Sequence, residues 1–167
     1  MGTTTVTAEP GNQLITVTRD FDAPVDVVFR AWTDPDLLKQ WLGPRRLTTE
    51  IDRYELRAGG SWRYLQREAD GREYAFHGVF HNDPSPDGFV QTFEFEGAPG
   101  HVSLDTLRLE ALPDGRTRAH MNSVFQSVEA RDGMIAAGME GGMNEGFDRL
   151  DELLASQAAA AGATSGG

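Results

Sequence analysis

Between residues 47 and 125, hydrophobic and polar residues alternate in a series of short segments, and this period of two predicts β-strands. In one segment Phe89, Phe93 and Phe95 share one parity, whereas Thr92 and Glu94 occupy the other. Turns rich in Gly, Pro and Asp separate the segments, which indicates strands joined in series as an antiparallel meander. The strands expected here are residues 47–55, 62–65, 74–80, 89–95, 102–112 and 117–125, and a β-branched run at 14–19 predicts a further strand before them.

Apolar residues recur at helical spacing in three other places. A helix is expected over residues 24–33, where Pro24 suits a helix start, and Asp34 is expected to cap a second short helix. A long helix is expected over about residues 130–156. Its apolar stripe consists of Ile135, Met139, Met143, Phe147, Leu150 and Leu154.

This order of elements predicts an α+β fold with a curved antiparallel sheet of about seven strands. Two short helices follow the first strand, and the long C-terminal helix packs across the concave face. A single helix cannot fill that face, so either large side chains occupy the remaining space or a cavity is left. We expect one domain over residues 13–156, a flexible N-terminal segment over 1–12 and a disordered C-terminal tail over 157–167.

Several motifs follow one another along residues 13–155. They are Phe21-Asp22-Ala23-Pro24, Trp32-Thr33-Asp34-Pro35, Trp41-Leu42-Gly43-Pro44, Gly59-Gly60-Ser61-Trp62-Arg63-Tyr64, Asp70-Gly71-Arg72-Glu73-Tyr74, Phe76-His77-Gly78-Val79-Phe80 and Gly138-Met139-Glu140-Gly141-Gly142-Met143-Asn144. In this ordered combination the chain resembles the bacterial Hsp90-ATPase-activator homologues (AHSA1-like proteins) of the START-like, or SRPBCC, superfamily. The resemblance implies the helix-grip fold with a cavity between helix and sheet. Members with known roles bind apolar ligands, activate a chaperone, confer antibiotic resistance or, in distant branches, cyclise polyketides.

Strand parity and the helical stripe together nominate the residues that would line such a cavity. They are Trp62, Tyr64, Phe76, Phe80, Phe93, Phe95, Met121 and Phe125 from the sheet, with Met139, Met143 and Phe147 from the long helix. Aromatic and Met side chains offer large, adaptable apolar contacts. We interpret them as a site for a small hydrophobic ligand of an aromatic, polyketide-like or lipid-like class, as the resemblance implies. The alternative is that these side chains fill the core.

Two other functions compete with ligand binding. An Hsp90 co-factor role is implied by the resemblance, but the eukaryotic activator has an additional N-terminal domain, and only about ten residues precede the first strand here, so we do not favour Hsp90 as a partner. A cyclase- or hydrolase-like enzyme would need a buried titratable group in the cavity. The sequence shows no nucleophile and base at a readable spacing, so we favour a binding protein and assign no catalytic residue. Glu96 at the cavity mouth, with Asn122 and Ser123, could supply polar contacts.

Composition narrows the range of partners. With 15 basic and 26 acidic residues the formal charge is −11, which disfavours nucleic acid and anionic membranes. Cysteine is absent, which excludes thiol chemistry, and the four histidines form no metal-binding pattern, so we expect neither metal nor cofactor. The first residues do not resemble a secretory signal, and we expect a cytoplasmic location. A homodimer is left open, since Trp32 and Trp41 form either an exposed patch or core contacts.

The expected long helix contains five glycines, which lower its intrinsic stability by about 0.5–1 kcal/mol each relative to Ala. They are Gly133, Gly138, Gly141, Gly142 and Gly146. Two explanations are open: the helix approaches the sheet closely, or it bends and opens over the cavity.

Overall fold

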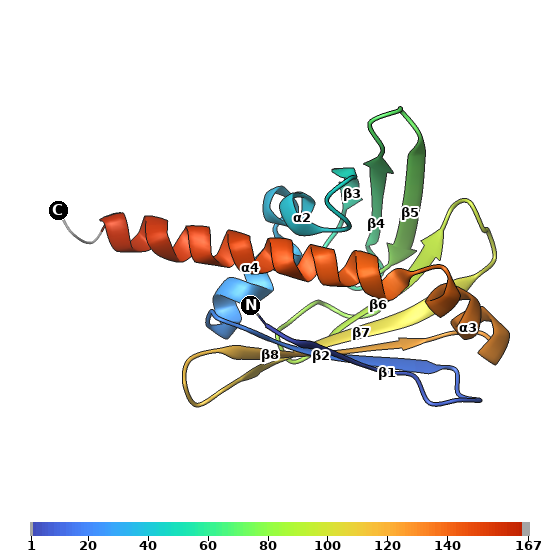
Figure 1. The fold of residues 1–167 in the computed structure, drawn as a ribbon, viewed down its shortest axis with the longest axis horizontal. Coiled ribbons are helices and arrows are strands. Elements are labelled where there is room, and N and C mark those ends of the chain that lie inside the picture. Colours follow the sequence, from blue (N-terminus) through green and yellow to red (C-terminus); the bar gives the residue numbers. More distant parts are fainter. Residues whose placement is uncertain (1, 165–167) are drawn as a thin grey trace.

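The computed structural model describes residues 2–164, and within them one curved antiparallel sheet carries a long helix across its concave face (Figure 1). The strands are β1 (Thr4–Thr7), β2 (Leu14–Phe21), β3 (Thr48–Tyr54), β4 (Ser61–Arg67), β5 (Glu73–Val79), β6 (Phe89–Phe95), β7 (Val102–Ala111) and β8 (Thr117–Val124), in the spatial order β1-β2-β8-β7-β6-β5-β4-β3. The helices are α1 (Val25–Thr33), α2 (Pro35–Trp41), α3 (Val128–Ala136) and α4 (Met139–Thr164). The predicted α+β helix-grip class is confirmed, with one strand more than expected.

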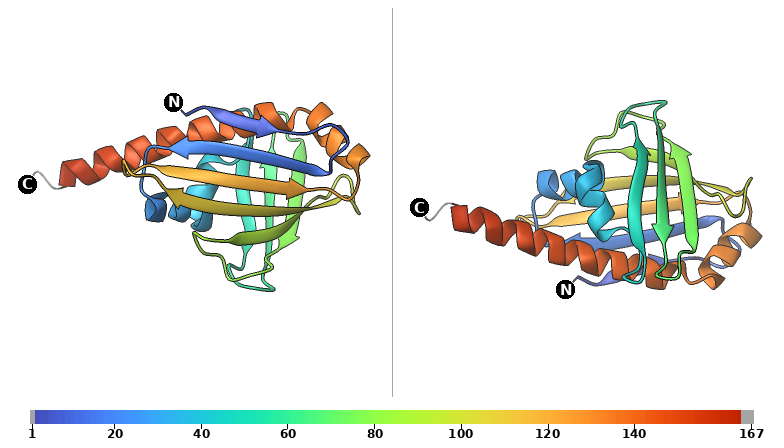
Figure 2. Two further views of the ribbon diagram at one scale, coloured as in Figure 1. Left: turned by 90° about the horizontal axis from the view of Figure 1, so that it is seen from below. Right: turned by 90° about the horizontal axis from the view of Figure 1, so that it is seen from above.

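The sheet bends between β5 and β6, and this bend creates its concave face. Only two residue pairs, Phe76–Phe95 and His77–Glu94, join these strands in register, whereas β4 and β5 share seven. Figure 1 shows β3, β4 and β5 standing away from the layer of β1, β2, β8 and β7, with α4 crossing between the two parts. The left view of Figure 2, seen from below, shows the same helix running behind that layer and past its edge toward the C-terminus.

The two short helices close one end of the concave face. Asp34 caps α2 as predicted, because its carboxylate accepts a 2.9 Å hydrogen bond from the backbone N–H of Asp36. The buried indole of Trp41 donates to the carbonyl oxygen of Ala31 at 3.0 Å, which ties α2 to α1. Trp32 and Trp41 pack edge to face with ring centroids 4.8 Å apart, so they make core contacts and do not form an exposed dimer patch.

The N-terminal segment differs from the flexible state expected for residues 1–12. Thr4–Thr7 forms β1 and pairs with β2 along its whole length. Arg19 donates a 2.7 Å hydrogen bond to the Thr4 hydroxyl, and Arg131 donates one of 2.6 Å to the Glu9 carbonyl. These contacts reach far along the chain, which is why the local sequence does not reveal them. Met1 lies outside the described residues.

The C-terminal helix also differs from the single helix expected over residues 130–156. Gly138 has a φ of +85°, which ends α3, and α4 begins at the next residue. Instead of a disordered tail after residue 156, α4 continues to Thr164, because the run Ala158–Ala161 has the highest intrinsic helix propensity. Residues 165–167 of that expected tail lie outside the described residues.

A buried cation fixes α4 to the sheet. Arg19 on β2 is 2% exposed and pairs with Asp148 at 3.0 Å and Asp151 at 2.6 Å, both on α4. Its guanidinium also lies 5.6 Å from the ring centres of Phe21 and Phe147. The middle of α4 is therefore held firmly over β2. No helix within residues 2–164 is long and apolar enough to cross a membrane.

Candidate functional site

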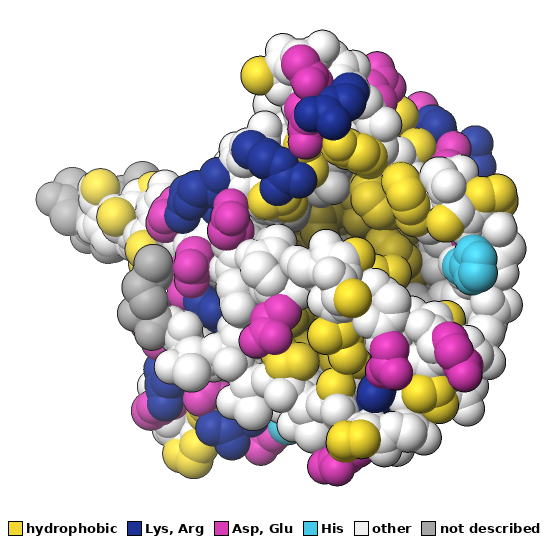
Figure 3. All heavy atoms as spheres, turned by 45° about the vertical axis from the view of Figure 1, so that its right-hand side comes forward, with side chains coloured by type: hydrophobic (Ala, Val, Ile, Leu, Met, Phe, Trp, Pro, Cys, Tyr) yellow, Lys and Arg dark blue, Asp and Glu magenta, His cyan; other side chains and the backbone are white. Residues whose placement is uncertain are grey.

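A cavity of about 230 Å³ lies between the concave face of the sheet, the short helices and the first turns of α4. Figure 3 shows one side of the molecule hollowed, with hydrophobic side chains gathered in the hollow. The residues that line the cavity are Val17, Trp32, Leu38, Leu42, Tyr54, Trp62, Tyr64, Phe89, Gln91, Phe93, Asp105, Thr106, Leu107, Met121, Asn122, Ser123, Met139 and Met143. Residues from nine elements thus meet around one space.

An aromatic wall forms one side of the cavity. Trp62 and Tyr64 project from β4 and stack with ring centroids 5.4 Å apart, and Phe93 lies 5.9 Å from Trp62. Gly78 faces Trp62 across the β4–β5 ladder. A Cβ at Gly78 would lie 1.9 Å from the Thr92 carbonyl oxygen and 2.7 Å from the indole, so glycine is needed for the ring to rest there.

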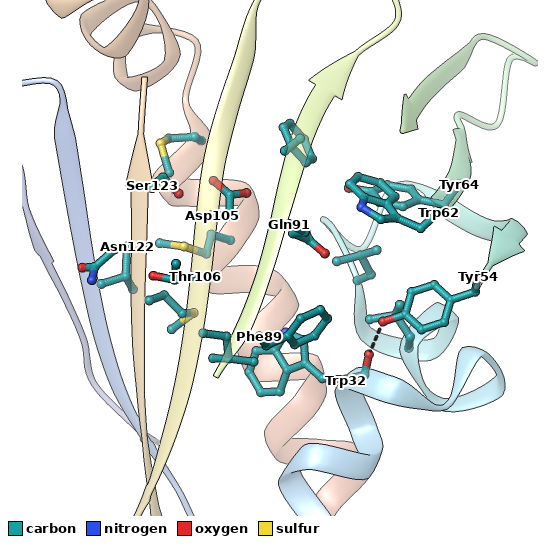
Figure 4. A pocket seen from close by; sticks show the side chains of 18 residues that line it. Trp32, Tyr54, Trp62, Tyr64, Phe89, Gln91, Asp105, Thr106, Asn122 and Ser123 are labelled. Carbon is teal, nitrogen blue, oxygen red and sulfur yellow. Dashed lines mark hydrogen bonds between the residues drawn. The ribbon is translucent and has the colours of Figure 1, made fainter. Parts of the chain in front are cut away.

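A carboxyl group forms the opposite side. Asp105 on β7 shares the inward parity of Ser103 and Leu107, and it accepts a 3.1 Å hydrogen bond from the Ser103 hydroxyl. Burial raises the pKa of Asp105 to about 6, against a smaller lowering by hydrogen bonds from Ser123 and Ser103. Figure 4 shows Asp105 and Ser123 on one side of the space and Trp62 and Tyr64 on the other. Asp105 is therefore a polar group in surroundings that are mostly apolar.

Two further polar groups border the same space. Trp62 is only 3% exposed, and its buried indole nitrogen has no hydrogen-bond partner. Figure 4 shows this nitrogen directed toward Gln91, whose side chain extends into the cavity from β6. The Tyr54 hydroxyl, in contrast, donates a 2.6 Å hydrogen bond to the Trp32 carbonyl oxygen. Burial raises the pKa of Tyr54 well above its usual range, so the phenol stays protonated.

The start of α4 covers the cavity through Met139 and Met143. One turn further on, a Cβ at Gly146 would lie 3.2 Å from the Trp41 carbonyl oxygen and 3.3 Å from the Gly43 nitrogen, so this glycine allows close packing against α2. A Cβ at Gly133 or Gly141 would meet nothing within 4 Å. Close approach therefore explains Gly146 but not the glycines on either side of the α3–α4 break.

Of the eleven residues nominated from sequence, six line this cavity: Trp62, Tyr64, Phe93, Met121, Met139 and Met143. The other five lie elsewhere. Phe76 packs behind the wall against Tyr64 at 5.0 Å, and Phe80 is fully buried between Tyr54 and Phe89. Phe95 and Phe125 border a second hollow of about 90 Å³ under α3, and Phe147 is buried among Phe21, Trp32 and Trp41. Parity identified the correct face, but not the depth at which each ring lies.

The expectation for Glu96 is wrong. Its carboxylate accepts hydrogen bonds from Arg63 at 2.8 and 3.1 Å and lies 3.2 Å from the His77 ring, a cluster that does not border the cavity. Arg63 and His77 have the parity opposite to Trp62 and Phe76, which places them on the outer face. Hydrogen bonding to Arg63 keeps the pKa of Glu96 below its usual range. Ser123 borders the cavity beside Asp105, whereas the exposed side chain of Asn122 has the opposite parity and points away from the space (Figure 4).

Sequence reasoning missed Asp105, although the strand pattern contained a signal for it. The parity of Leu107 and Leu109 places Asp105 among inward-facing residues, where a carboxylate is unusual. Tyr54 was missed for another reason: the register of β3 shifts between Ile51 and Arg53. A bulge of this kind changes which parity faces inward, so alternation alone gives the wrong side. The remaining lining residues that were not nominated are Val17, Trp32, Leu38, Leu42, Phe89, Gln91, Thr106 and Leu107.

Comparison with known proteins places this geometry in a structural context. A protein from Rhodobacter sphaeroides is 26% identical with a TM-score of 0.83, covering 92% of this chain and 99% of its own. A protein from Arthrobacter aurescens is 29% identical with a TM-score of 0.83, covering 91% of each chain. A Silicibacter pomeroyi protein, titled AHSA1, is 19% identical with a TM-score of 0.70 over 86% of this chain and 99% of its own, and shares the fold. A search of curated proteins gave no match.

The family match agrees with the resemblance read from the motifs. The model described as "Activator of Hsp90 ATPase homolog 1-like protein" matches residues 22–155, which include every element that borders the cavity except β2 and the last turns of α4. Because the match spans most of the sequence, the chain belongs to the Activator of Hsp90 ATPase homolog 1-like family.

Proposed function

We propose that this protein binds a small hydrophobic molecule in the cavity between the sheet and α4. The observation that carries the proposal is the unfilled space of about 230 Å³ bordered by aromatic and Met side chains. Protein interiors are normally close-packed, and an apolar void loses the contacts that its lining would otherwise make. A ligand that fills the space restores those contacts.

The volume sets the scale of the ligand. A dry cavity of about 150 Å³ accepts benzene, whereas pockets for drug-sized molecules measure about 300–1,000 Å³. At about 230 Å³ the space holds two fused rings, and a third ring can extend through the open side of the hollow in Figure 3. The stacked Trp62 and Tyr64 provide flat surfaces against which a planar molecule can rest.

Fluorescence titration tests the proposal with N-phenyl-1-naphthylamine, a dye that is uncharged at neutral pH and becomes bright in apolar surroundings. The wild-type protein should bind the dye saturably at one site. Met143→Trp, which places a larger side chain in the cavity, should weaken binding by at least about tenfold, a difference of ~1.4 kcal/mol.

Ile135→Trp provides the matched control, because Ile135 is exposed on α3 and does not line the cavity. This variant should bind the dye within about twofold of wild type. Absence of saturable binding by folded wild-type protein would refute the proposal. Equal weakening in the two variants would place the dye elsewhere on the molecule.

Asp105 gives specific support to a second candidate function, acid–base catalysis on a hydrophobic substrate in the same cavity. The enzyme alternative requires a buried, hydrogen-bonded titratable group there, and Asp105 has these properties with a pKa of about 6. The test compares molecules extracted from wild type and Asp105→Asn after expression in the native host. Catalysis predicts a chemically different bound species in the variant, whereas binding alone predicts the same species at equal or lower occupancy.

Activation of Hsp90 is a separate proposal whose support is the family description. Addition of this protein to a bacterial Hsp90 ATPase assay tests it directly, and our ligand-binding proposal predicts an unchanged rate.

We propose the cytoplasm as the place of ligand binding, which fractionation of the native host would test.

A further inference from the structure

The polar groups of the cavity carry information about the ligand that its apolar walls do not. Among the 18 residues that line the space, Asp105 is the one carboxylic acid, and none is Lys, Arg or His. The other titratable side chains among them are Tyr54 and Tyr64, whose pKa values are both raised by burial. Asp105 therefore has no cationic partner among the residues that surround the cavity.

The immediate neighbours of Asp105 are weak substitutes for a counter-ion. Ser103 on the same strand and Ser123 on β8 offer hydroxyl hydrogen bonds, and these lower the pKa of Asp105 by less than burial raises it. Across the space lie Tyr64 from β4 and Gln91 from β6, and α4 contributes Met139 and Met143. At neutral pH the carboxylate is ionised and incompletely compensated, which leaves it available to a cation.

The aromatic wall favours the same kind of ligand. A cation is attracted to the negative face of an aromatic ring, most strongly to Trp, when it lies within about 6 Å of the ring centre. Trp62 and Tyr64 lie opposite Asp105 across the space (Figure 4), and Phe93 packs with its ring centre 5.9 Å from that of Trp62. The formal charge of −11 further favours approach of cations over anions.

From this arrangement we infer that the ligand is an apolar amine, whose protonated nitrogen pairs with Asp105 while its hydrocarbon or aromatic body contacts Trp62 and Tyr64. This inference rests on the proposed function and specifies its ligand class. The unpartnered indole N–H of Trp62 adds a second feature, since an acceptor atom on the same ligand would satisfy it. A neutral alcohol of the same shape lacks the charge-assisted hydrogen bond to Asp105.

Isothermal titration calorimetry tests the inference with 2-phenylethylamine and its neutral analogue 2-phenylethanol. At pH 7 the amine should bind wild-type protein at least about tenfold more tightly than the alcohol, the usual scale of a hydrogen bond to a charged group. Asp105→Asn should reduce amine affinity by about tenfold or more and leave alcohol affinity within about threefold.

Asp52→Asn supplies the matched control, because it removes one negative charge from a residue that pairs with Arg63 outside the cavity. It should leave both affinities within about twofold. If Asp105→Asn does not fold, the pH dependence of wild type gives an independent test. Amine affinity should fall by about tenfold per pH unit below pH 6, where Asp105 must release a proton, whereas alcohol affinity should not.

The failures of the two proposals are distinguishable. If the alcohol binds as tightly as the amine, or if Asp105→Asn leaves the preference for the amine unchanged, the amine inference is overturned while ligand binding stands. The inference is also overturned if neither compound displaces N-phenyl-1-naphthylamine from the cavity. If the dye itself does not bind, the proposed function fails by its own test.

Discussion

The Ser103 hydroxyl donates a 3.1 Å hydrogen bond to the carboxylate of Asp105, and both side chains lie on the concave face of β7. This hydrogen bond offsets only part of the cost of placing a carboxylate in the apolar cavity, because burial still raises the pKa of Asp105 to about 6. A protein that keeps such a group loses stability for it, and such perturbed groups gather at functional sites. We therefore expect the Asp105 carboxylate to lower the stability of the folded protein while it supports ligand binding.

Replacement of Asp105 by Asn should stabilise the unliganded protein in a pH-dependent way. The folded pKa, about 6, lies above the unfolded value near 3.8, so the folded state binds more protons between these values. The contribution of Asp105 to the free energy of unfolding of the wild-type protein therefore falls as pH rises from about 4 to 6. At about 1.4 kcal/mol per pKa unit, the advantage of the variant should reach about 2–3 kcal/mol at pH 8 and vanish near pH 3.5.

Urea denaturation of both proteins at pH 3.5 and pH 8 measures this difference. An advantage that is the same at both pH values would show that the ionisation of Asp105 is not its source. A destabilised variant at pH 8 would show that the hydrogen bonds from Ser103 and Ser123 compensate the buried carboxylate fully.

The glycines of α4 should respond in opposite directions to the same substitution. Gly146→Ala should destabilise the protein by about 1 kcal/mol, because its Cβ would crowd the backbone of Trp41 and Gly43. Gly141→Ala should stabilise it by about 0.5 kcal/mol, since its Cβ meets nothing within 4 Å and Ala favours the helix. Thermal unfolding of the pair checks the prediction, which fails if both midpoints move the same way.

The ion pairs of Arg19 should differ in importance according to burial. Asp151→Asn should lower the free energy of unfolding by about 2 kcal/mol, because it removes a charged partner of a buried guanidinium. Asp148→Asn should cost less, since that carboxylate is 38% exposed and better solvated. Chemical denaturation of the two single variants ranks them, and a larger loss for Asp148→Asn would contradict the assignment of Asp151 as the main partner.

Glu96→Gln should leave cavity binding of N-phenyl-1-naphthylamine within about twofold of wild type. The reason is that Glu96 pairs with Arg63 and His77 on the outer face, outside the cavity. A tenfold loss of dye affinity in a folded variant would show that Glu96 does contribute to the binding site.

The elements that sequence predicted well are those defined by local patterns. The six strands from β3 to β8, the short helices and the Asp34 cap all follow from alternation, helical spacing and capping chemistry. The strand β1 could not be predicted this way, because it forms by pairing with β2 and accepts a side-chain hydrogen bond at Thr4 from Arg19. The break at Gly138 was obscured by an apolar stripe that continues across it.

The sequence predicted which face of the sheet the candidate site residues occupy, but not how deeply each side chain is buried. Alternation places Phe80 and Phe93 on the same side of the sheet, but curvature buries Phe80 against Tyr54 and leaves Phe93 at the cavity. That curvature arises where the pairing of β5 with β6 is interrupted, a tertiary feature that no periodicity encodes. Asp105 could have been found, since parity alone places it beside Leu107.

The central claim is that a ligand occupies the cavity under α4, and the methionines offer the most direct test. Met121, Met139 and Met143 line the cavity, whereas Met134 borders the smaller hollow under α3. In protein labelled with [methyl-¹³C]methionine, NMR titration with N-phenyl-1-naphthylamine should shift the three cavity methyl signals, each assigned by substitution with Leu, and leave Met134 nearly unmoved. Saturable binding that shifts Met134 alone, or none of the three cavity methyl groups, would contradict the account.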